Sequence, residues 1–313
     1  MLGRVAIVAV LCALGGCLSR FEPFPPGARS VELTGVPFFP QKLHQCGPAA
    51  LATVLANRGL PVTADDLVDE VYLPGREGSL QVEIVAAVRR HDLVPYPIDG
   101  RLDEVIEEIA ASRPVLVLQN LGVSWYPVWH YAVVVGYDVD RDQLITRSGT
   151  IERRREGRTI FMRTWARSRF WAISVLAPGE LPARADAPKL FRTLAEMEAV
   201  GKRDIARAGY RAMAERWNAP EGYFGLGNLA LADQDWLGAE RDFRATIACA
   251  GGRHVAAQNN LAMALLGRGC AAEAVAEADA ALAQLAADDP LAAVVGDTAR
   301  QARERLASGA VCR

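Results

Sequence analysis

Residues 41–59, QKLHQCGPAALATVLANRG, decide how the first half of the chain folds. After Cys46, apolar residues recur at helical spacing, at Ala50, Leu51, Val54 and Leu55. Pro48 is tolerated near a helix start because the amide that it lacks would have no partner there, and Gly59 favours a stop. The stretch therefore predicts a helix with Cys46 in its first turn. The unpaired amides and the positive end of the helix dipole should favour the thiolate form of this cysteine.

The residues after this helix predict more helices and then a sheet. Thr63 and Ser79 are typical N-caps, for helices over residues 64–72 and 80–91, and a further helix is expected at 102–112. Runs rich in β-branched and aromatic residues follow, at 115–121, 130–138, 143–149 and 170–176. A short edge strand broken by proline is expected at 31–40. Helices followed by an antiparallel sheet predict an α+β domain over residues 31–178.

A histidine begins the strand with the highest β propensity. His130 follows an aromatic cluster of Trp125, Tyr126 and Trp129. A cysteine at a helix start and a histidine on a later strand form the arrangement that brings a thiol and an imidazole together. The alternative for His130 is a packed, hydrogen-bonded residue with no role in chemistry.

Two segments carry a resemblance to a known family. QKLHQCGPAALATVL (41–55) and WHYAVVVGYD (129–138) resemble the bacteriocin-processing, double-glycine-type cysteine peptidases, a branch of the papain-like fold. The resemblance covers about residues 35–178. It implies that Cys46 attacks the substrate carbonyl and that His130 acts as base and acid.

The resemblance also implies an amide that helps to hold the oxyanion. The matching residue is Gln41, and Gln45 is a second amide that ranks below it. The alternative for Gln45 is a solvent-exposed turn residue. His44 is a rival base by its position, although an exposed turn histidine is the preferred interpretation.

The third catalytic residue is where the sequence departs from the family. The family places an Asp, followed by Pro, on the strand after the histidine strand, whereas residues 144–149 (LITRSG) contain no carboxylate. Thr146 or Ser148 could accept the ring N–H, or Asp138 or Asp140 could fold back from the turn. A neutral partner stabilises imidazolium less than a carboxylate does, because hydrogen bonds to charged acceptors are roughly twice as strong.

The N-terminus has the features of an export signal. Arg4 precedes an apolar run, and residues 14–17 read LGGC, which resembles the bacterial lipobox. This resemblance implies a signal peptide over residues 1–17 and lipidation of Cys17, with a linker at 18–30. The expected location is the bacterial cell envelope, on the outer membrane facing the periplasm. The alternative is a signal-anchor helix.

The second half predicts an all-α domain after a linker at 179–189. Within residues 190–313, Ala206, Ala239 and Ala274 are separated by steps of 33 and 35 residues, and the fourth residue after each is Tyr210, Phe243 or Ala278. This pattern resembles the tetratricopeptide repeat, with residues 291–308 as a capping helix. Such repeats would offer a concave surface to a peptide or partner protein. The alternative is an ordinary alanine-rich helical bundle.

Composition excludes some functions and limits the disulfides. A net charge of −2 with mixed signs argues against nucleic-acid binding, and no His or Cys cluster has metal-ligand spacing, so we expect no metal and no cofactor. Cys249 and Cys270 should lie at opposite ends of helices roughly 20 Å long, too far apart for a disulfide. A bridge between Cys270 and Cys312 is a hypothesis, and Cys46 must stay free.

Together these observations predict an exported, lipid-anchored cysteine peptidase that cleaves a peptide or protein substrate. In fold class, it is an α+β papain-like domain followed by an all-α tetratricopeptide repeat domain. Two alternatives remain open: a catalytically weak or inactive domain that acts as a protein-binding module on the membrane, and a thiol acyltransferase.

Overall fold

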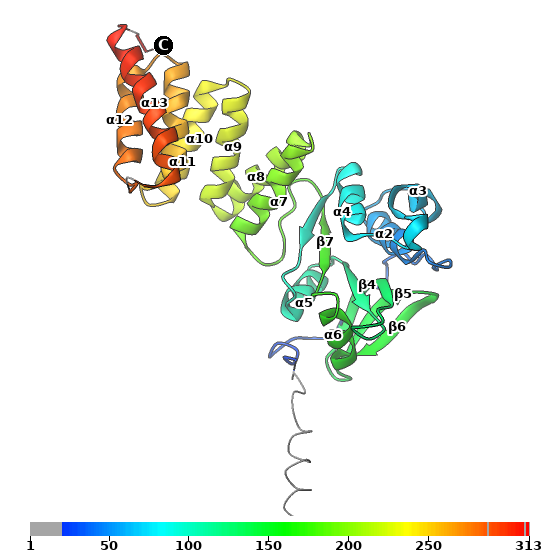
Figure 1. Cartoon of the computed structure of the whole chain (residues 1–313). Helices are drawn as coiled ribbons and strands as arrows, with labels where there is room; N and C mark the ends of the chain where they lie inside the picture. The colour runs from blue at the N-terminus through cyan, green and yellow to red at the C-terminus, as the bar shows by residue number, and fades with distance from the viewer. Residues whose placement is uncertain (1–20, 287, 310, 313) are drawn as a thin grey trace, which may run out of the picture.

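The structure of the chain is a computed structural model that describes residues 21–286, 288–309 and 311–312. The expected signal peptide, and Cys17 with its expected lipidation, therefore lie outside the described residues. An α/β half comes first, and helices then extend away from it as an elongated array (Figure 1). Among the described residues, no helix is both long and apolar enough to cross a membrane.

The first half is built on one antiparallel sheet of seven strands. Its strand order is β2-β7-β3-β4-β5-β6, and β1 pairs with β4 beside the end of β3. The strands are β1 (Val31–Glu32), β2 (Val94–Pro97), β3 (Val115–Asn120), β4 (Trp129–Asp138), β5 (Gln143–Ser148), β6 (Ile151–Gly157) and β7 (Ala172–Leu176). The antiparallel sheet and the short entering strand agree with the sequence prediction.

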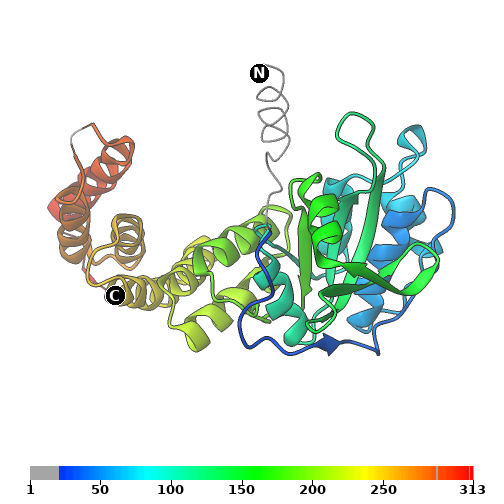
Figure 2. The same ribbon diagram turned by 90° about the horizontal axis from the view of Figure 1, so that it is seen from below.

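Helices cover both faces of this sheet (Figure 2). The helical segments of this half are α2 (Cys46–Asn57), η1 (Asp65–Leu67), α3 (Val68–Val71), η2 (Pro74–Arg76), α4 (Gln81–Arg90), α5 (Leu102–Ala110) and α6 (Arg158–Ala166). On β4, Tyr131, Val133 and Val135 join the core with α2 and α4, whereas Ala132 and Val134 join the core with α5 and α6. This central strand is buried on both faces, which explains its continuous apolar run.

Several local expectations need correction. Ser79 does not cap α4, because the N-cap residue is Leu80 and the Ser79 hydroxyl is buried with no hydrogen-bond partner. The reciprocal contacts expected around Thr63 do form, since the Asp66 amide donates to the Thr63 hydroxyl and the Thr63 amide donates to the Asp66 carboxylate, but the N-cap residue of η1 is Ala64. The expected helix at 64–72 is divided into η1 and α3. Strands β2 and β6 and helix α6 were not expected from the sequence.

The second half is helical, as predicted. Its helices are α7 (Ala187–Ala199), α8 (Arg203–Trp217), α9 (Pro220–Ala232), α10 (Trp236–Cys249), α11 (Val255–Gly267), α12 (Ala271–Leu282) and α13 (Pro290–Ala307). Ala206, Ala239 and Ala274 are each the fourth residue of their helices, and all three are fully buried. These repeated small residues let neighbouring helices approach closely. The expected capping helix at 291–308 corresponds to α13.

The two halves share an apolar core. Leu190 and Leu194 of α7 and Tyr210 of α8 belong to the same buried cluster as Val94 of β2. At the start of α7, the Nζ atom of Lys189 lies 2.8 Å from the Asp99 carboxylate. The first helices after the expected linker are therefore packed on the sheet domain, and the domain boundary at 179–189 stays a prediction.

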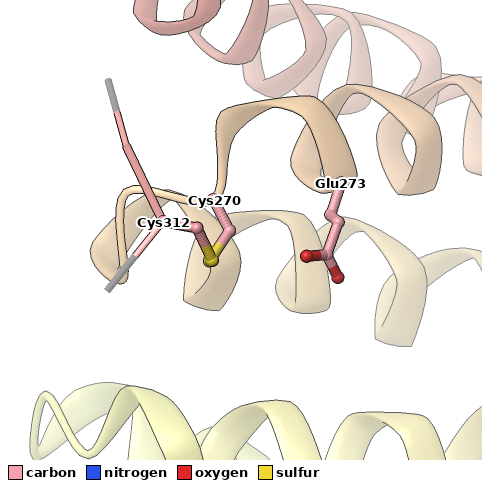
Figure 3. A group of neighbouring side chains, drawn as sticks. All are labelled: Cys270, Glu273 and Cys312. Atoms are coloured by element: carbon pink, nitrogen blue, oxygen red, sulfur yellow. A yellow bond between two sulfur atoms is a disulfide. The ribbon is translucent and has the colours of Figure 1, made fainter.

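A disulfide fixes the end of the chain. Cys270, just before α12, is bonded to Cys312, and their Cα atoms lie 4.1 Å apart (Figure 3). This bridge confirms the hypothesis from the sequence. Cys46 and Cys249 are free thiols.

Candidate active site

The start of α2 holds the sulfur of Cys46 among backbone amides. The backbone amides of Cys46, Gly47 and Tyr131 lie close enough to the sulfur to act on the pKa of the thiol in the lowering direction. A side chain at Gly47 is excluded, because an added Cβ would lie 2.1 Å from the hydroxyl oxygen of Ser79. The small residue lets the first turn of α2 pack closely on the segment before α4, and so positions the thiol.

The second candidate residue, His130, lies near the start of β4, directly before Tyr131. Its side chain is buried, and Gln119 of β3 is its partner in the strand register. The Tyr131 amide lies near the Cys46 sulfur, so the Cys46 and His130 segments adjoin, but His130 itself is not among the residues that line the cavity beside Cys46. The Nε2 atom of His130 lies 2.8 Å from the hydroxyl oxygen of Ser148. The Nδ1 atom has no hydrogen bond to any residue within the described part of the chain.

One of the four candidate orienting residues is in place. Ser148, at the end of β5, contacts the ring of His130. Thr146 is buried on the same strand but makes no hydrogen bond to that ring. Asp138 accepts from Arg141 and Arg155, which lower the pKa of its carboxyl to about 2. Asp138 is therefore not the orienting residue, since its hydrogen bonds go to the two arginines.

Gln41 lies beside the cysteine. Its backbone amide donates to the carbonyl of Gly149 at 3.0 Å, which ties the loop before α2 to the turn after β5. Gln41, Cys46 and Ser148 line a small cavity of about 10 Å³, roughly the space of one water molecule. The Oε1 atom of Gln41 is buried and has no hydrogen-bond partner among the described residues.

The other polar residues near Cys46 have structural surroundings. Gln45 is the N-cap residue of α2, but its side chain makes no capping hydrogen bond. His44 is exposed in a left-handed turn (φ 61°), and its Nε2 atom lies 3.9 Å from a carboxylate oxygen of Glu77. The histidine is thus an exposed turn residue, as the sequence analysis preferred.

The charge states of the pair differ from the sequence prediction. Burial raises the pKa of the Cys46 thiol, although the three amides that contact the sulfur act in the opposite direction. Burial, together with the positive charge of Arg154, lowers the pKa of His130 to about 4. Near neutral pH both groups are therefore uncharged in the resting protein. The expectation of a preformed thiolate was wrong because the cost of desolvation exceeds the stabilisation by the amides.

Arg147 is a site residue that sequence reasoning did not single out. It is buried between Thr146 and Ser148, lines the cavity beside Cys46, and donates to the backbone carbonyls of Thr34, Val36 and Glu152. No carboxylate forms an ion pair with it in the described residues. In the sequence, Arg147 lies within residues 144–149, the stretch that lacks the expected carboxylate, and this position was the feature that could have identified it.

The first half of the chain is similar to known proteins. Residues 33–172 match the model of the Peptidase_C39 like family. A structure described as a C39-like peptidase from Bacillus anthracis is 18% identical, with a TM-score of 0.40, and the match covers 48% of this chain and 98% of that one. The peptidase domain of Streptococcus ComA, a bi-functional ABC transporter, is 21% identical, with a TM-score of 0.37, and covers 45% and 98% of the two chains. A comparison with curated proteins found no match.

Proposed function

We propose that the chain is a cysteine peptidase in which Cys46 is the nucleophile and His130 the general base. The observation that carries this proposal is the contact of the Cys46 sulfur with the Tyr131 amide, because it places a thiol at a helix start beside the residue that follows a buried histidine. The family match over residues 33–172 supports the same reaction class.

The reaction would begin from a neutral pair. As the Cys46 sulfur attacks the carbonyl carbon of the substrate, the ring of His130 takes the thiol proton, and Ser148 keeps the ring oriented through Nε2. Gln41 is the proposed donor to the oxyanion, through its Nε2 atom. His130 then gives the proton to the leaving amine, and water hydrolyses the thioester to free the thiol.

Peptide cleavage tests this proposal directly. The wild-type chain is incubated with a peptide library, and new N-termini are identified by mass spectrometry. We expect cleavage that is lost in Cys46→Ala and strongly reduced in His130→Ala, while Cys249→Ala retains full activity. Products that persist in Cys46→Ala would refute the assignment. If an added amine replaces water in the products, the reaction is acyl transfer.

A protein-binding module is the second candidate. It is favoured because no carboxylate is hydrogen-bonded to His130 in the described structure, and because the pKa of this ring is lowered; both weaken the imidazolium form. In that case, Cys46→Ala would retain peptide binding, and neither protein would cleave any member of the library.

The remaining parts of the proposal concern location and partners. The LGGC motif at residues 14–17 supports lipidation of Cys17 and attachment to the bacterial envelope, with the outer membrane as the proposed site. The equivalent buried positions in α8, α10 and α12 support tetratricopeptide-like repeats that recruit a substrate or partner protein. Radiolabelled palmitate incorporation that is lost in Cys17→Ala would test the anchor.

A further inference from the structure

The loop between β3 and β4 carries an exposed group of large apolar side chains. Trp125 is 85% exposed and Tyr126 is 70% exposed, far more than aromatic residues that pack in a core. Four more apolar side chains of the same segment are exposed, namely Leu121, Val123, Val128 and Trp129. We call residues 121–129 the aromatic hairpin. It ends immediately before His130.

Hydrogen bonds hold the aromatic hairpin in a defined conformation. The side-chain oxygen of Asn120 accepts from the amides of Gly122 and Val128, at 3.0 and 2.9 Å, and Val123 and Tyr126 exchange a pair of backbone hydrogen bonds. Gly122 is needed for this close packing, because an added Cβ would lie 2.3 Å from the carbonyl oxygen of Tyr126. The hairpin therefore presents its aromatic rings on an ordered support.

Helix α6 extends this exposed surface with positive charge. Arg167, directly after the helix, donates to the carbonyls of Asn120 and Gly122 at the base of the hairpin, at 3.1 and 2.7 Å. Ile160, Arg163 and Arg167 are exposed and recur at helical spacing on one side of α6. Neither of these two arginines forms an ion pair with a carboxylate in the described part of the chain. Their charge is free to meet a negative partner.

The other end of α6 holds the beginning of the described chain. Arg158 donates to the backbone carbonyls of Phe21 and Glu22. In the sequence, Cys17 is only four residues before Phe21, and a chain segment of that length spans at most about 14 Å. If Cys17 carries lipid, the bilayer must therefore lie close to α6. The helix from Arg158 to Arg167 is itself only about 14 Å long.

We propose that the aromatic hairpin and the exposed side of α6 form a membrane-binding surface for a bilayer with anionic headgroups. Trp and Tyr favour the bilayer interface, because their rings are apolar and their N–H or O–H groups stay hydrated. Arginines beside them attract anionic lipids. The surface would hold His130 and Cys46 close to the bilayer, where membrane-bound substrates are presented. This proposal does not depend on the catalytic step.

Vesicle sedimentation tests the proposal without the lipid anchor. The protein used is the chain from residue 18 to 313, which retains every described helix and strand and lacks Cys17. Vesicles contain phosphatidylethanolamine with phosphatidylglycerol, or phosphatidylcholine alone. We expect the protein to sediment with the anionic vesicles, and Trp125→Ser/Tyr126→Ser to bind them roughly tenfold more weakly. Arg163→Ser should bind about fivefold more weakly to anionic vesicles and unchanged to neutral ones.

A matched control distinguishes binding through this surface from nonspecific binding of any exposed apolar residue. Leu237 on α10 is also well exposed, and Leu237→Ser should bind vesicles as the wild type does. Circular dichroism and Tm establish that each variant is folded. The proposal is overturned if the wild type stays in the supernatant, or if the hairpin variants bind vesicles normally. If the same variants raise KM for a cleaved peptide while vesicle binding is unchanged, the hairpin is a substrate-binding element instead.

Discussion

Lowering the pH from 8 to 5 should reduce the free energy of unfolding by about 2 kcal/mol more in the wild type than in His130→Gln. The reason is that burial, together with the charge of Arg154, lowers the pKa of His130 from 6.5 to about 4. The unfolded ring regains its ordinary pKa, so the unfolded state binds more protons between these two values. Stability is therefore complete above the unfolded pKa and falls as the pH approaches 4.

The magnitude follows from the two pKa values. The difference between the two pKa values corresponds to about 3.4 kcal/mol of unfolding free energy. This full amount is lost only below the folded pKa, where the ring is protonated in both states. At pH 5, about 2 kcal/mol of this has been lost. His130→Gln keeps a polar side chain but removes the titration, and the carboxylates titrate in both proteins, so their contribution cancels in the comparison.

Two measurements check this prediction. Urea unfolding at pH 5, 6, 7 and 8, followed by far-UV circular dichroism, gives the difference in unfolding free energy between the two proteins. The NMR titration of the His130 ring, assigned by its absence in His130→Gln, gives the pKa itself. An equal pH dependence of the two proteins, or a ring that titrates at or above pH 6.5, would show that His130 is not held neutral and would refute the account of the resting pair.

Further predictions concern three positions around Cys46 and His130. Gln41→Ala should lower kcat by about 10²-fold with little change in KM, because an oxyanion donor acts in the transition state; a change confined to KM would contradict this role. Ser148→Ala should lower kcat about fivefold, the equivalent of a neutral hydrogen bond worth about 1 kcal/mol. Ser148→Asp should raise the pKa of His130 and move the acidic limb of the pH–rate profile upward, whereas an unmoved limb would argue against the contact. Gly47→Ala should destabilise the chain by about 1–3 kcal/mol, through the clash with Ser79. The loss should appear as a lower Tm, and adding Ser79→Gly should restore part of it. A Tm that is not restored would show that the strain lies elsewhere.

The sequence was sufficient for the elements with strong local signals. The helix that begins at Cys46 and the continuous apolar strand after His130 formed as predicted, because periodicity and propensity agree with burial at both. Strand β6 was missed because IERRREG is mostly charged, and it is an edge strand whose side chains are largely exposed. Strand β2 was missed because two of its four residues are prolines.

The candidate site was predictable in its residues but not in its charge states. Cys46 and His130 were identified by residue type and position, Gln41 was identified by the family resemblance, and Ser148 was one of four candidates for the orienting position. A choice among these four needed the register of β4 and β5, which a sequence does not provide. The raised pKa of Cys46 depends on burial by residues distant in the chain, whereas the helix-start argument considers only local amides.

Covalent labelling of Cys46 is the direct measure of whether Cys46 and His130 work as a catalytic pair. The probe is a peptidyl vinyl sulfone at pH 7, and Cys249, an exposed free thiol in the same molecule, is the internal control. We expect one main adduct, mapped by mass spectrometry to Cys46, with slow reaction at Cys249 and almost none at Cys46 in His130→Ala. Equal labelling of the two cysteines, or undiminished labelling of Cys46 in His130→Ala, would contradict a catalytic pair.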